Sequence, residues 1–167
     1  AIWIHDGRGE RSLSSEGDIV SDISPPSFGA HDRVLYYLLQ RGADRAGPEL
    51  WRTTVNTGKS EAVFPGVSMV AFDISPDDKQ VVFSGAMRGG PTQLWLAPLD
   101  RSSPARRIGG SSETRPHFGP NGQILFQAIE GNFNYLEQMN PDGSRRSKVI
   151  PYPIVAIQGI SPERRWV

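Results

Sequence analysis

Three histidines are the side chains best suited to acid–base or metal chemistry in this 167-residue chain: His5, His31 and His117. Neutral imidazole is a common ligand of transition metals when several rings converge. These three have different surroundings, because His5 precedes an Asp-Gly turn, His31 lies in a long loop and His117 lies in a predicted strand. Their spacing does not place them together, so the sequence predicts no metal site.

Acidic residues are the second set that could bind an ion, since calcium prefers carboxylate oxygens. Asp18, Asp22 and Asp32 lie within one stretch, and Asp77 and Asp78 are adjacent. No twelve-residue calcium-binding loop surrounds them, and aspartate is common in turns. Turn capping is therefore the favoured interpretation.

Catalytic motifs are absent from the sequence. Residues 58–60 read Gly-Lys-Ser, like the end of a phosphate-binding loop, but the upstream glycine of that motif is missing, so an exposed hairpin turn is predicted. Neither Gly-x-Ser-x-Gly nor His-Glu-x-x-His occurs. We therefore predict no catalytic residue, no cofactor and no enzymatic activity in this chain.

The composition argues against several classes of protein. The 18 basic and 18 acidic residues balance, so no attraction to nucleic acid is predicted. The absence of cysteine excludes a disulfide scaffold and a thiolate metal site. No apolar run approaches the ~20 residues of a membrane span, so no membrane insertion is predicted. The 18 glycines and 14 prolines favour short strands joined by turns.

A repeated segment predicts the strands and turns that would position any functional side chain. Its four copies occupy residues 22–25, 73–76, 117–120 and 159–162, and their final prolines are 51, 44 and 42 residues apart. This period is typical of β-propeller blades. Each copy precedes a turn and an apolar strand, as in the run Val-Val-Phe at 81–83. In the first copy, residues 26–30 are predicted to form a longer loop.

A second phase of the repeat places an aromatic residue in a short alternating strand. Trp3, Trp51, Trp95 and Tyr135 are 48, 44 and 40 residues apart, in step with the prolines. A turn and a short outer strand follow each of them, so each repeat predicts a four-stranded sheet with the aromatic in its core. Such sheets bury both faces by stacking around an axis. The predicted fold class is all-β: a β-propeller fragment with three complete four-stranded blades and a half blade at each end.

The two phases also predict where the blades begin and end. The expected half blades are residues 1–15 and 153–167, and the expected complete blades are 16–66, 67–110 and 111–152. The chain opens without methionine and closes on what reads as the start of a strand, which predicts a fragment of a longer protein. The remainder of the parent chain could complete the ring. Alternatively, two copies could exchange half blades as a homodimer.

Two stretches resemble the TolB-type propeller repeat, which reads roughly Ser-Pro-Asp-Gly and then apolar-Tyr-x-Met-Asp-x-Asp-Gly. They are Ile-Ser-Pro-Asp-Asp-Lys-Gln-Val-Val-Phe at 74–83 and Tyr-Leu-Glu-Gln-Met-Asn-Pro-Asp-Gly at 135–143. Gly119 in place of serine and Glu163 in place of aspartate depart from the pattern.

The resemblance implies a non-catalytic scaffold in the periplasm or another extracytoplasmic compartment of a bacterium, with a protein or peptide partner. Two alternatives stay open. One is the substrate-gating propeller of a prolyl-oligopeptidase-type hydrolase. The other is a propeller lyase, which would use several histidines to hold a divalent metal.

Loops between the second and third strands are the predicted partner-binding surface, because loops on rigid scaffolds often carry recognition. Their arginine, methionine and aromatic content is typical of protein interfaces. The candidate residues are Arg41, Arg45, Met87, Arg88 and Phe133.

Paired arginines occupy matching positions in two repeats, at 106–107 and 145–146, just before or within the predicted outer strands. We interpret both pairs as edge charges that discourage sheet-to-sheet association.

Overall fold

The computed structural model describes residues 2–6, 9–13, 18–30, 33–41, 47–161 and 164. It divides into two compact units, Ala1–Met69 and Val70–Val167. Its strands pair antiparallel within four sheets. No apolar helix of membrane-spanning length occurs among the described residues.

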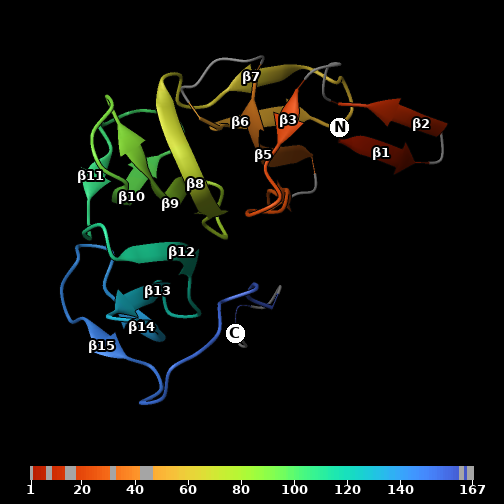
Figure 1. The fold of residues 1–167 in the computed structure, drawn as a ribbon. Helices are drawn as coiled ribbons and strands as arrows, with labels where there is room; N and C mark the ends of the chain where they lie inside the picture. The colour runs from red at the N-terminus through yellow and green to blue at the C-terminus, as the bar shows by residue number, and fades with distance from the viewer. Residues whose placement is uncertain are drawn as a thin grey trace. The chain divides into compact units, whose positions relative to one another are not determined.

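The first unit contains a hairpin and a larger sheet (Figure 1). The hairpin pairs β1 (Trp3–Asp6) with β2 (Gly9–Ser12). The larger sheet has the order β3-β5-β6-β7, and β4 also pairs with β5. Its strands are β3 (Ile19–Val20), β4 (Ser27–Phe28), β5 (Val34–Gln40), β6 (Glu49–Thr54) and β7 (Ser60–Ala62). Residues 35–39 of β5 are buried on both faces, which explains the unbroken apolar run there.

The first Ser-Pro copy differs from the prediction. Ser27 and Phe28 form β4 and pair with Tyr36 and Leu35, whereas Val20 of β3 pairs further along β5. The expected loop at residues 26–30 is therefore wrong in part: the first strand is interrupted, and it resumes before the turn. The prolines at 25 and 26 lack the N–H that a continuous ladder needs, which accounts for the interruption.

The core of the first unit shows which aromatic residues are buried. Leu35, Tyr37, Leu39 and Trp51 form a cluster, and Ile2 packs against it among other partly buried residues. Trp3, by contrast, is 63% exposed. Neighbouring residues of a strand face opposite sides, so Ile2 packs inward and Trp3 faces away from this cluster. The predicted core position is therefore confirmed for Trp51 and wrong for Trp3.

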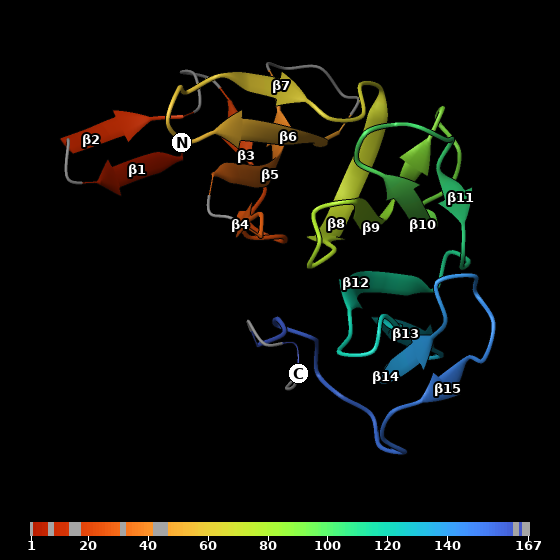
Figure 2. The same ribbon diagram turned by 180° about the vertical axis from the view of Figure 1, so that it is seen from behind.

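The second unit contains two four-stranded sheets, with orders β8-β9-β10-β11 and β12-β13-β14-β15 (Figure 2). The first comprises β8 (Val67–Ile74, beginning just before the unit boundary), β9 (Gln80–Met87), β10 (Gln93–Pro98) and β11 (Arg106–Arg107). The second comprises β12 (Glu113–Phe118), β13 (Ile124–Glu130), β14 (Phe133–Met139) and β15 (Ser147–Lys148). In each sheet the strands follow one another in chain order, as expected for propeller blades.

The turn between β8 and β9 explains why the Ser-Pro sequence recurs. The Ser75 hydroxyl accepts hydrogen bonds from the backbone N–H groups of Lys79 (3.2 Å) and Gln80 (2.8 Å), and donates to the Asp77 carboxylate at 2.7 Å. These bonds satisfy backbone groups that the hairpin leaves unpaired. The predicted roles of Ser75 in the turn and of Asp77 in capping are confirmed.

A continuous apolar layer joins the two sheets of the second unit. Its buried members come from both sheets: Val82, Leu94, Leu96, Ile108, Phe118, Ile124, Phe126, Ala128 and Met139. A second cluster, formed by Leu125, Leu136 and Ile157, lies on the opposite face of β13 and β14. The segment after β15 therefore packs on this sheet. Its described residues form no strand, and Ile154 makes one isolated bridge with Asn134.

Candidate functional site

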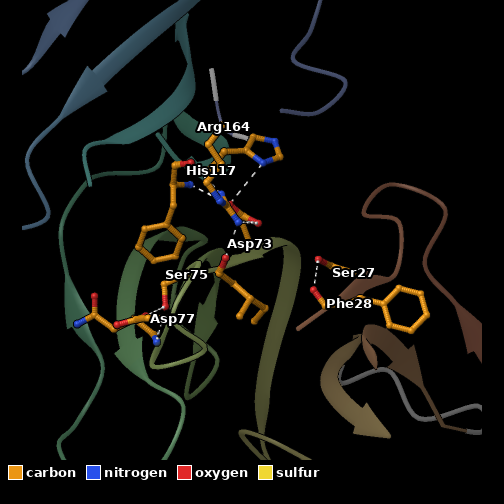
Figure 3. Close-up of polar contacts among 10 residues, drawn as sticks. Ser27, Phe28, Asp73, Ser75, Asp77, His117 and Arg164 are labelled. Atoms are coloured by element: carbon orange, nitrogen blue, oxygen red, sulfur yellow. Dashed lines mark hydrogen bonds and ion pairs between the residues drawn. The ribbon is translucent and has the colours of Figure 1, made fainter. Parts of the chain in front are cut away.

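A buried polar cluster lies where the first strands of the two sheets in the second unit end. The Asp73 carboxylate, at the end of β8, accepts a hydrogen bond from the Phe118 backbone N–H at 2.8 Å. Its Oδ2 also contacts Nη1 of Arg164 at 2.5 Å. His117 Nδ1 is 3.9 Å from the same oxygen. Figure 3 shows these contacts meeting at Asp73. We call Asp73, His117, Phe118 and Arg164 the strand-end cluster.

Arg164 occupies the same turn position as Asp78 and Gly122, three residues after the first residue of each turn. All three have positive φ angles, of 54°, 54° and 76° respectively. This region suits glycine and strains an arginine. The Arg164 guanidinium compensates with further hydrogen bonds to the carbonyl oxygens of Phe118 (2.8 Å) and Ile74 (2.7 Å). The side chain thus joins Arg164 to the ends of β8 and β12.

The electrostatics of the strand-end cluster keep His117 neutral over a wider pH range than usual. Burial lowers the pKa of the His117 imidazole, and the positive charges of Arg164 and Arg115 lower it further. The Asp73 carboxylate acts in the opposite direction and raises it. Since the pKa is lowered overall, burial together with the two arginines outweighs the single carboxylate.

A second polar cluster lies between β12 and β14. The Arg146 guanidinium forms ion pairs with Glu113 and Glu137, and the Glu137 pair measures 2.5 Å. Both glutamates are buried, and the guanidinium also lies over the Phe126 ring, 5.2 Å from its centroid. The prediction that Arg146 is an edge charge is therefore wrong, because it neutralises buried carboxylates. Arg106 and Arg107 are exposed in the outer strand β11, as predicted.

Exposed apolar side chains gather around the β13–β14 hairpin. Phe133 is 57% exposed, Tyr152 72% and Val155 91%. Asn134 brings the segment that contains Tyr152 and Val155 to β14, because its backbone oxygen accepts from the Ile154 N–H at 2.8 Å and its side-chain amide donates to the Val155 oxygen at 2.9 Å. We call Phe133, Tyr152 and Val155 the hairpin patch. The sequence singled out Phe133 alone, since the other two lie on a segment that reaches β14 through tertiary pairing.

The predicted loop residues lie in different places. Met87 and Arg88 share the turn that follows β9, which is closed by a hydrogen bond from the Gly90 N–H to the Met87 oxygen at 3.0 Å. Arg88 is exposed with φ of 52°. Arg41 belongs to the first unit and stacks on Trp51, 3.9 Å from the ring centroid. Arg45 lies outside the described residues.

The histidines do not converge in the part of the chain that the structure describes. His5 pairs with Glu10 at 3.4 Å on the β1–β2 hairpin, whereas His117 belongs to the strand-end cluster of the other unit. His31 lies outside the described residues. Within the described ranges, no three His, Cys, Asp or Glu residues are arranged to hold a metal ion.

No protein-family model and no curated protein sequence matches this chain. Several solved structures, however, do match it. TolB from Acinetobacter baumannii is 18% identical, with a TM-score of 0.64 over 86% of this chain and 35% of that one. An oligogalacturonate lyase in complex with manganese is 15% identical, with a TM-score of 0.62 over 81% and 40%. A prolyl endopeptidase is 16% identical, with a TM-score of 0.54 over 79% and 22%.

These likenesses establish the fold: the chain is a β-propeller fragment, similar to TolB-like propellers. It spans less than half of each of the three structures. The same fold occurs in TolB and in two kinds of enzyme, so function has to be argued from the surface and the sites of this chain.

Proposed function

We propose that this chain is a non-catalytic, protein-binding segment of a TolB-like propeller, and that it binds a peptide segment of its partner through the hairpin patch. The observation that carries the proposal is the exposure of Phe133 on β14 and of Tyr152 and Val155 on the segment that pairs with Asn134. Single exposed apolar residues are ordinary, but several together mark interaction sites.

The hairpin patch has the rigidity that binding favours. Phe133 begins β14, whose seven residues all pair with β13. The bonds from Asn134 fix the course of the neighbouring segment. A surface that is already ordered loses less conformational entropy when a partner binds. Aromatic side chains such as Phe133 and Tyr152 commonly anchor interfaces.

The charged surroundings of the hairpin patch are already paired. Lys148 lies over the Tyr135 ring, 3.5 Å from its centroid, and pairs with Glu130 at 2.7 Å. The patch therefore offers apolar area next to a neutralised ion pair, which favours an apolar or aromatic peptide over a highly charged one. The resemblance to TolB supports an extracytoplasmic location in a bacterium as part of the same proposal.

A random-peptide phage library selected on the wild-type chain tests this function. We expect selected peptides to be rich in aromatic and aliphatic residues. Phe133→Ser and Tyr152→Ser should each weaken their binding about tenfold or more, because burying one such side chain contributes about 1.5–3 kcal/mol. Biolayer interferometry with synthetic versions of the selected peptides measures the affinities.

The matched control is Phe28→Ser in the other unit, since Phe28 is 53% exposed, much like Phe133. This control should bind the selected peptides as tightly as wild type. Failure to select any peptide would contradict the proposal, and so would peptides that bind Phe133→Ser and Tyr152→Ser with wild-type affinity.

A further inference from the structure

The β12–β13 turn differs from the equivalent β8–β9 turn in the residues that hold its side chains. Gly119 stands where the β8–β9 turn has Ser75. Asn121 stands where it has Asp77. The Asp77 carboxylate is held by the Ser75 hydroxyl at 2.7 Å (Figure 3) and by the Lys79 N–H at 3.2 Å. The Asn121 side-chain amide, by contrast, makes no hydrogen bond within the described part of the chain, so it can turn toward the peptide bond that follows it.

The peptide bond after Asn121 is also open to attack. Asn121 and Gly122 are both exposed. Apart from the chain neighbours of Gly122, no atom lies within 4 Å of the position that a Cβ would occupy there. The Gly122 N–H reaches the Gly119 oxygen only at 3.3 Å, which is longer than an ordinary hydrogen bond. The backbone nitrogen of Gly122 is therefore unshielded and weakly held.

We propose that the Asn121–Gly122 peptide is a site of spontaneous covalent modification, at which the unheld asparagine is converted to aspartate or isoaspartate. Asparagine is one of the thermally labile residues of proteins. The Gly122 backbone nitrogen loses its proton to solvent and bonds to Cγ of Asn121, while the Cγ–Nδ2 bond breaks and Nδ2 leaves as ammonia. Water then opens the cyclic imide. Opening at Cγ gives aspartate, and opening at the backbone carbonyl gives isoaspartate.

The two products should change the turn differently. Aspartate adds a negative charge and gives residue 121 the side chain of Asp77 in the equivalent turn, so the turn should keep its shape. Isoaspartate routes the backbone through Cβ and Cγ, which lengthens a turn closed by the Gly119 N–H and the Gln123 oxygen at 2.7 Å. That product should loosen the β12–β13 hairpin. This inference goes beyond the proposed function and does not rest on it.

The second unit contains two internal controls for this chemistry. Asn132 is also exposed in a turn, but it precedes Phe133, which carries a bulky side chain and pairs with Glu130 in the sheet. Asn140 precedes Pro141, which has no N–H to lose. Asn132 therefore reports the rate at a crowded peptide bond, and Asn140 reports the background.

Incubation of the whole chain at mildly alkaline pH, followed by proteolysis and fragmentation mass spectrometry, measures the loss of each side-chain amide. We expect Asn121 to react about tenfold faster than Asn132 or more, which corresponds to a barrier lower by about 1.4 kcal/mol. Asn140 should stay intact. Equal rates at Asn121 and Asn132 would overturn the proposal.

The variant Gly119→Ser tests why Asn121 is reactive. A serine at this position should hold the Asn121 side chain as Ser75 holds Asp77, and slow its conversion about threefold to tenfold, the effect of one hydrogen bond. An unchanged rate at Asn121 in this variant would also overturn the proposal. If the variant does not fold, the comparison of Asn121 with Asn132 in the wild-type chain still decides the outcome.

Discussion

Replacing Arg146 by methionine should destabilise the second unit by removing the ion-pair partner that two buried carboxylates share. The side chains of Glu113 and Glu137 are 3% and 5% exposed, and Arg146 is their shared partner. Breaking a buried ion pair from one side costs about 3–5 kcal/mol. Arg146 is itself 43% exposed, so water partly replaces it, and we expect a loss of about 2–3 kcal/mol.

Urea unfolding measures this loss as a fall of about 1 M in the transition midpoint, given the usual slope for a protein of this size. The matched control is Arg107→Met on the exposed strand β11, which should change stability by less than about 0.5 kcal/mol. The triple variant Glu113→Gln, Glu137→Gln, Arg146→Met removes all three charges and should recover most of the loss. Wild-type stability in Arg146→Met, or a triple variant no more stable than the single, would refute this reasoning.

Three further changes test other parts of the fold. Gly143→Ala should lower the thermal unfolding temperature more than Gly122→Ala does. Both glycines have positive φ, but only at Gly143 would an added Cβ lie 2.9 Å from the Ile108 oxygen. Equal losses in the two variants would contradict this. Ser75→Ala should cost about 1–2 kcal/mol in urea unfolding, because its hydroxyl closes the β8–β9 turn. His117→Gln should flatten the pH dependence of the free energy of unfolding. Because the pKa of His117 is lowered in the folded chain, the unfolded chain binds more protons below about pH 6.5. The stability of the wild type should therefore fall on acidification, and that of the variant should fall less.

The local features of the fold could be predicted because they depend on residues close in sequence. The Ser75 turn and the buried second strands follow from turn chemistry and from apolar runs, which act over a few residues. The pairing of β4 could not be predicted from the sequence, because the Ser-Pro repeat suggested a turn at the point where the chain resumes its strand at Ser27. The exposure of Trp3 could not be predicted either, because the repeat does not specify which face of its strand is covered by neighbouring residues.

The candidate sites depend on long-range packing, so the sequence identified them only in part. Asp73 and Arg164 are 91 residues apart, yet they form an ion pair. Arg146 looks like an edge charge because its glutamate partners lie on other strands. Phe133 could be identified from the sequence, whereas the segment that contains Tyr152 and Val155 reaches β14 only through the pairing of Asn134 with Ile154. Such contacts are specified by the stacked sheets rather than by local sequence.

Hydrogen exchange of the whole chain, with and without a selected peptide, tests the central claim most directly. The proposed function predicts that bound peptide slows amide exchange in residues 129–135 and 150–156, around the hairpin patch, and leaves the Met87–Arg88 turn and the first unit unchanged. Protection confined to that turn or to the first unit, with exchange at the hairpin patch unaltered, would contradict it.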